Sequence, residues 1–96
     1  MPTDTPLQSP PSGVAPYRKT PIFDSATVPA NLLGDHSTKA GVWAVIHVLR
    51  GEVVFRHKAP ATEHRLAAGE TLACPPEAKH SIALSEDARF QIEFWR

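Results

Sequence analysis

The stretch that most limits how this chain can fold is residues 69–80, Gly-Glu-Thr-Leu-Ala-Cys-Pro-Pro-Glu-Ala-Lys-His. Residues 71–74 form a short apolar run of strand length, and Gly69 can adopt the positive φ that a tight turn into a strand requires. The two prolines that follow have no backbone N–H to donate, so a strand ladder must end there. His80 then opens a second apolar run. The sequence therefore predicts a strand, a stiff turn and a second strand that begins with a histidine.

Other short strands are expected along the chain. The strongest, residues 42–49, is rich in β-branched and aromatic side chains, and residues 90–94 alternate between apolar and polar. Residues 17–23 and 29–33 predict two more strands near the N-terminus. Because no segment shows a convincing helical period, we expect an all-β sandwich or barrel.

The chain of 96 residues has room for one domain. Residues 1–16 are rich in proline, serine and threonine and predict a disordered tail. An extended arm on a partner surface is the alternative. Residues 17–96 are expected to form the folded domain.

Composition excludes several classes of partner. Ten basic residues balance ten acidic ones, so we expect no nucleic-acid binding and no attraction to anionic membranes. No apolar run approaches the roughly 20 residues of a membrane-spanning helix, and no secretory signal is expected. A single cysteine cannot form an internal disulfide, which favours a reducing compartment, the cytoplasm.

Two turns resemble the signatures of the cupin superfamily. Gly69, Pro75 and His80 have the spacing of the second signature, although Glu77 stands where cupins usually carry a glycine. The turn of residues 48–53 resembles the end of the first. The resemblance implies a cupin-type double-stranded β-helix, a jelly-roll barrel, over residues 17–96.

The same resemblance implies an incomplete metal site. Cupins usually carry a metal-binding glutamate at the position of Ala44, and of two expected histidines only His36 is present. A chain that departs from the usual cupin pattern in this way resembles one branch of the superfamily. Residues 17–23, 36–43 and 75–80 resemble the small cupins related to tellurite-resistance protein B.

Four residues are predicted to line a ligand pocket, and two of them to hold a divalent metal. His36 and His80 are the expected metal ligands, and imidazole suits zinc, nickel, copper or iron. Two ligands are too few for a tight zinc site, so ordinary loop histidines are the alternative. Lys39 is a candidate for binding an anion, and Trp43 either walls the pocket or packs in the core or an interface.

No catalytic residue is predicted. Cys74 shares a strand face with Leu72, and buried packing is its expected role. His57 and His64 flank a hairpin loop and are expected to be solvated.

The first functional reading is a non-catalytic cupin module that binds a metal ion or small ligand, for example in a response to tellurite or other toxic oxyanions. A metal-dependent cupin enzyme, such as a dioxygenase or isomerase, is the second. The third is a structural or regulatory homodimer with an empty barrel. Homodimerisation is expected because Trp43, Val45 and Leu49 form a second apolar face on the strongest strand. The alternative is that the N-terminal strand around Ile22 and Phe23 covers part of this face.

Overall fold

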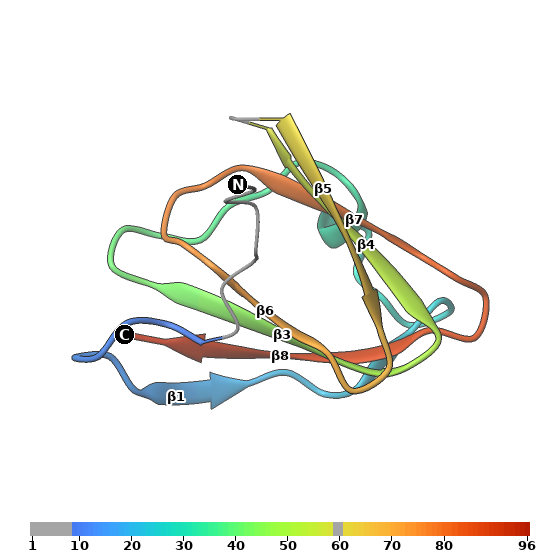
Figure 1. Ribbon diagram of the computed structural model, residues 1–96, viewed down its shortest axis with the longest axis horizontal. Coiled ribbons are helices and arrows are strands. Elements are labelled where there is room, and N and C mark those ends of the chain that lie inside the picture. Colours follow the sequence, from blue (N-terminus) through green and yellow to red (C-terminus); the bar gives the residue numbers. More distant parts are fainter. Residues whose placement is uncertain (1–8, 59–60) are drawn as a thin grey trace, which may run out of the picture.

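The computed structural model of the protein describes residues 9–58 and 61–96 and confirms an all-β architecture (Figure 1). Within these residues, eight strands and one short helix follow one another. They are β1 (Pro16–Lys19), β2 (Phe23–Asp24), α1 (Ala30–Leu33), β3 (Trp43–Arg50), β4 (Glu52–Lys58), β5 (Ala61–Ala67), β6 (Thr71–Cys74), β7 (His80–Leu84) and β8 (Arg89–Trp95).

The strands form two antiparallel sheets. The larger has the order β1-β8-β3-β6, with β2 also paired to β8, and the smaller has the order β5-β4-β7. Within the described residues no strand pairing closes these sheets into a barrel, and the finer expectation of a cupin-type jelly roll remains a prediction. In Figure 1 the sheets converge towards the tight β3–β4 turn and diverge at the other end.

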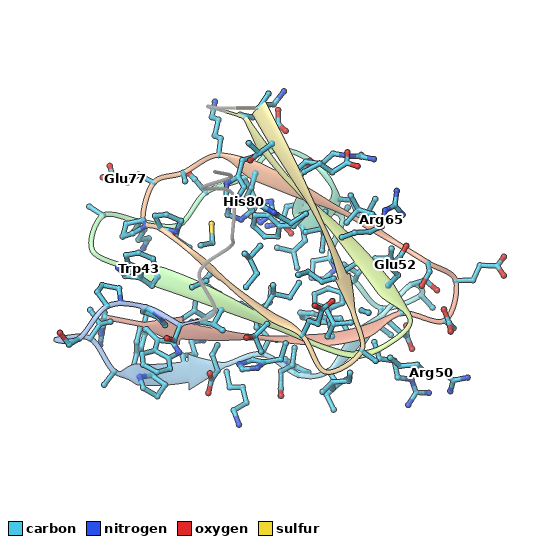
Figure 2. The ribbon with its side chains drawn as sticks, viewed as in Figure 1. Trp43, Arg50, Glu52, Arg65, Glu77 and His80 are labelled. Carbon is cyan, nitrogen blue, oxygen red and sulfur yellow. The ribbon has the colours of Figure 1, made fainter. Side chains whose placement is uncertain are left out.

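The hydrophobic core fills the space between the sheets. Val48 and Phe90 of the larger sheet and Val53 of the smaller are almost completely buried, since alternate residues of each strand face the opposite sheet. Figure 2 shows His80 among the side chains between the sheets, whereas Arg50 points away from them. The core comprises Ala44, Ile46, Val48, Val53, Phe55, Leu66, Leu72, Cys74, Ile82, Ala88, Phe90 and Ile92.

Two tight turns depend on residues with positive φ. Gly51, between β3 and β4, has a φ of 69°, and a Cβ there would lie 2.6 Å from the Asp87 carboxylate and 2.8 Å from the Ala88 Cα. Only glycine fits without displacing the backbone. In the double-proline turn, Glu77 has a φ of 62°, so the residue that replaces the usual cupin glycine keeps a glycine-like conformation.

The helix α1 corrects the strand that was predicted over residues 29–33. Pro29, with φ −61° and ψ 138°, occupies the N-cap position, and its carbonyl accepts a hydrogen bond of 3.0 Å from the Leu32 N–H. Leu32 packs against the core, and a short apolar run cannot distinguish a strand from a helical turn. Among residues 9–58 and 61–96, no helix is long and apolar enough to cross a membrane.

Paired main chain begins at Ala15, just before β1. Ala15 and Arg96 exchange two backbone hydrogen bonds, of 3.2 and 3.1 Å. The disorder predicted for residues 1–16 remains a prediction, and the first eight of those residues lie outside the described part of the chain.

The face of β3 that points away from the core is only partly apolar. Val45 is 2% exposed, whereas Leu49 is 49% exposed. Between them, His47 Nε2 lies 2.9 Å from the Glu93 carboxylate, and this hydrogen bond is the main reason why the pKa of Glu93 is lowered. The homodimer expected through this face remains a prediction.

Candidate functional site

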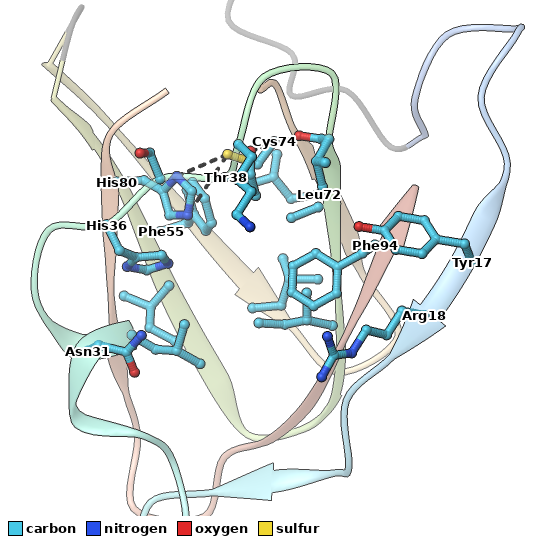
Figure 3. Close-up of a pocket in the computed structure, with 18 residues that line it drawn as sticks. Tyr17, Arg18, Asn31, His36, Thr38, Phe55, Leu72, Cys74, His80 and Phe94 are labelled. Atoms are coloured by element: carbon cyan, nitrogen blue, oxygen red, sulfur yellow. Dashed lines mark hydrogen bonds between the residues drawn. The ribbon is translucent and has the colours of Figure 1, made fainter. Parts of the chain in front are cut away.

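A cavity of about 340 Å³ lies between the two sheets, where they diverge (Figure 3). This size suits a small molecule. Its walls come from both sheets and are mostly apolar, because they continue the hydrophobic core. The apolar lining comprises Leu32, Val42, Ala44, Ile46, Phe55, Leu72, Ile82, Ile92 and Phe94.

The polar part of the lining carries positive charge. Arg18 of β1 and Lys39 of the loop before β3 both line the cavity, and neither forms an ion pair with another described residue. No aspartate or glutamate is among the described lining residues. The electrostatic field in the cavity therefore favours an anion.

His36 and His80 meet in this cavity, although they lie far apart in the sequence. Their ring centroids are 4.2 Å apart, with an angle of 76° between the ring planes. Each residue donates a backbone hydrogen bond of 2.9 Å to the carbonyl of the other. This bridge forms because β7 is an edge strand of the smaller sheet and its free side can pair with the loop before β3.

Backbone carbonyls fix the tautomer of both rings. His36 Nδ1 lies 2.9 Å from the Gly34 carbonyl oxygen, and His80 Nδ1 lies 2.8 Å from that of Ala78. A carbonyl can only accept, so in each neutral ring Nδ1 carries the proton and Nε2 carries the lone pair.

His80 is held in its neutral form by burial. The residue is 3% exposed, and its ring stacks on Phe55 at a centroid distance of 4.7 Å. Burial lowers the pKa of His80 to about 4, and the nearby His36 and His57 add to this effect. A charged imidazolium here would lose its hydration without gaining a carboxylate partner.

Cys74 contacts His80 but is not activated as a nucleophile. Its Sγ lies 3.0 Å from His80 Nδ1 and 3.7 Å from the Pro75 carbonyl oxygen, to which the thiol donates. Burial raises the pKa of the thiol to about 12, whereas thiol catalysis requires a thiolate. Cys74 is 1% exposed, which confirms its predicted role in the core.

The donor atoms present do not fit a tight metal site. His36 and His80 supply one Nε2 each, and the adjacent Cys74 keeps its proton. Throughout the part of the chain that the structure describes, no three His, Cys, Asp or Glu side chains are arranged to hold a metal ion. Structural zinc sites need four protein ligands and catalytic ones three.

The other two predicted pocket residues lie differently. Lys39 is exposed at the rim and lines the cavity. Trp43 is not among the lining residues. It directly precedes the inward-facing Ala44, so its side chain belongs to the opposite face of β3, in register with Trp95.

The sequence interpretation missed two residues near the cavity. Arg18 is paired with Phe94 across β1 and β8, which places both on the inner face. His57, expected in solvent, is half-buried, with its ring 4.9 Å from Phe55 and 6.4 Å from His80. Burial first, and the neighbouring His64 second, lower the pKa of His57. The sequence did contain a signal for this placement: His57 lies two residues after Phe55 on the same strand, so both side chains point to the same face of β4.

Comparison with known proteins relates the chain to one domain family. The sequence matches the TehB-like domain over residues 18–92. The crystal structure of a protein from Escherichia coli K12 superposes with a TM-score of 0.86 at 27% identity, covering 94% of this chain and 97% of that one. TehB from Haemophilus influenzae superposes with a TM-score of 0.77 at 25% identity, over 85% of this chain but only 31% of its own. No curated protein matches significantly.

Proposed function

Because the chain belongs to the TehB-like domain family, we propose that it is a non-catalytic, cupin-type module that binds a small anion between its two sheets. One observation carries this proposal: a cavity of about 340 Å³ that is lined by two cationic side chains and, among its described residues, by no carboxylate. The two facing antiparallel sheets support the cupin-type part of the proposal.

The surroundings strengthen the attraction for an anion. Arg18 and Lys39, both exposed, line the same cavity as the apolar Phe94 and Ile92. An anion that enters between apolar walls is screened by water less than one on the open surface. Since no described carboxylate competes for these cations, an entering anion meets two unpaired positive charges.

The family suggests which anions to test first. The resemblance to tellurite-resistance protein B makes tellurite and other toxic oxyanions the first candidates. A binding role rather than catalysis is supported by Cys74, which burial keeps as a neutral thiol. The cytoplasmic location and the homodimer remain predictions from the sequence.

The test is a titration of the protein with tellurite, phosphate and acetate, followed by calorimetry and by amide chemical shifts. Arg18→Gln should weaken the binding of an anion about tenfold, the magnitude expected for one charge-assisted hydrogen bond. Lys19→Gln is the matched control, because Lys19 is the next residue of β1 and pairs with Glu93, whose side chain points away from the core.

Two results would contradict the proposal. One is the absence of any saturable binding among the three anions. The other is an equal loss of affinity in both variants, which would mean that the anion responds to net charge and not to the cavity.

A further inference from the structure

The imidazoles of His36 and His80 present hydrogen-bond acceptors to the cavity. The Nδ1–H groups of His36 and His80 are already used by the carbonyls of Gly34 and Ala78. The Nε2 lone pairs are what remains for a ligand. Figure 3 shows both rings on one side of the cavity and Arg18 on the other.

These acceptor atoms have little compensation inside the protein. His36 is half-buried, and its Nε2 has no hydrogen-bond partner among the described residues and stays accessible to water; His80 Nε2 has only the Cys74 sulfur at 4.0 Å. A ligand that fills the cavity displaces the water that would otherwise solvate them. If that ligand brings no donor, the lone pairs are left unsatisfied, which costs binding free energy.

The cavity thus makes two different demands on its occupant. Arg18 and Lys39 require negative charge, and the imidazole pair requires an O–H or N–H group. Building on the anion-binding function proposed above, we infer that the ligand is an anion that carries its own hydrogen-bond donor, and that His36 and His80 select it against anions that have only acceptor atoms.

This requirement separates compact oxyanions of equal charge. Near pH 8, hydrogen phosphate and sulfate are both tetrahedral dianions of similar size, but only hydrogen phosphate has an O–H group. Arg18 and Lys39 alone would bind them equally. The imidazole lone pairs accept a hydrogen bond from hydrogen phosphate and face only oxygen lone pairs in sulfate.

A second pair tests a longer ligand, whose charged end and donor group lie at opposite ends of one ring. 4-Hydroxybenzoate and 4-methylbenzoate have the same charge and nearly the same shape, and each fits within about 340 Å³. Only the hydroxyl compound can donate to an imidazole while its carboxylate contacts a cation. Comparing the two pairs distinguishes a compact oxyanion from a larger hydroxy acid as the ligand.

The experiment measures the dissociation constants of all four anions by calorimetry at pH 8 with the wild-type protein. In at least one pair, the anion with an O–H group should bind at least about tenfold more tightly than the anion without one. This is the cost expected when the donor-free anion displaces water and leaves an imidazole acceptor unpaired. His36→Phe keeps a ring but removes one of the two acceptors, so it should lower this ratio several-fold, both by weakening the donor-bearing anion and by tightening the binding of sulfate or 4-methylbenzoate, which no longer leaves that lone pair unsatisfied.

His64→Phe is the control variant, because His64 is half-buried but does not line the cavity; its ratio should equal that of the wild type. Equal affinities within every pair that binds would overturn the selection by His36 and His80 and leave the anion-binding function intact. If none of the four anions binds, the inference fails; the anion-binding function fails with it when tellurite and acetate also show no saturable binding. The affinity ratio within each pair of anions is measured first in the wild-type protein, so it tests the inference even if a variant does not fold.

Discussion

Acidification should destabilise this fold mainly through His80. The side chain is 3% exposed, stacks on Phe55, and has a pKa of about 4 in place of its ordinary 6.5. The groups that face it are His36 from the adjacent loop, His57 from β4 and the neutral Cys74 thiol from β6. None of these can stabilise an added positive charge.

The magnitude follows from proton linkage. Between pH 6.5 and about 4 the unfolded chain binds a proton at this histidine and the folded protein does not, so the free energy of unfolding falls as the pH falls. The two pKa values differ by about 2.5, and each step of one is worth about 1.4 kcal/mol. The full loss is therefore about 3 kcal/mol, complete below about pH 4 and absent above about pH 7, from a typical total of roughly 5–15 kcal/mol.

The assay is urea unfolding at a series of pH values from 7.5 to 5.5, above the range in which the carboxyl groups of Asp24 and Glu93, with ordinary pKa values of 3.8 and 4.5, contribute most. His80→Phe can keep the stack on Phe55 but cannot bind a proton, so its stability should change much less with pH. An imidazole of His80 that titrates near pH 6.5 by NMR, or an undiminished pH dependence in His80→Phe, would refute this reasoning.

Four further predictions concern local structure and assembly. Gly51→Ala should lower the free energy of unfolding, measured in urea, by at least about 3 kcal/mol, because the new Cβ meets the backbone. Gly69→Ala is the control: Gly69 has a φ of 89° but open space around it, so the loss should be only about 1–2 kcal/mol. Glu77→Gly should raise the melting temperature, since glycine adopts a φ of 62° without strain; a lower melting temperature would contradict this. Cys74 should react with a thiol reagent only as fast as the protein unfolds, because it is buried and its pKa is about 12; rapid labelling of the native protein would argue against this. Sedimentation at pH 7.5 should show a homodimer, and a monomer would reject that prediction.

The strands could be predicted because their signals are local. Residues 71–74 form an apolar run closed by two prolines, and β6 has the same bounds. Residues 42–49 were predicted from β-branched side chains and differ from β3 by one residue at each end. Residues 29–33 were predicted as a strand but form α1. Leu32 packs on the core there, and a short apolar run does not by itself distinguish the two conformations.

The site was only partly predictable because its composition depends on contacts between distant strands. The signature spacing directed attention to His36 and His80. Arg18 joins them through the register of β1 against β8, and no local pattern encodes that register. For Trp43 the sequence left two roles open, a pocket wall or packing in the core or an interface. Trp43 does not line the cavity, because adjacent strand residues point to opposite faces and its neighbour Ala44 points inward.

Backbone hydrogen bonds link two loops at the rim of the cavity, and this determines how the rim can open. His36 and His80 exchange two hydrogen bonds of 2.9 Å, and the Glu77 N–H donates to the Thr38 carbonyl at 3.1 Å. Neither loop can swing outward without breaking contacts of the other, so the two loops open as one cooperative unit. The proposed ligand, by contacting both imidazoles, would bridge the two loops and make their joint opening rarer, which hydrogen exchange at the amides of His36, Glu77 and His80 would report as stronger protection.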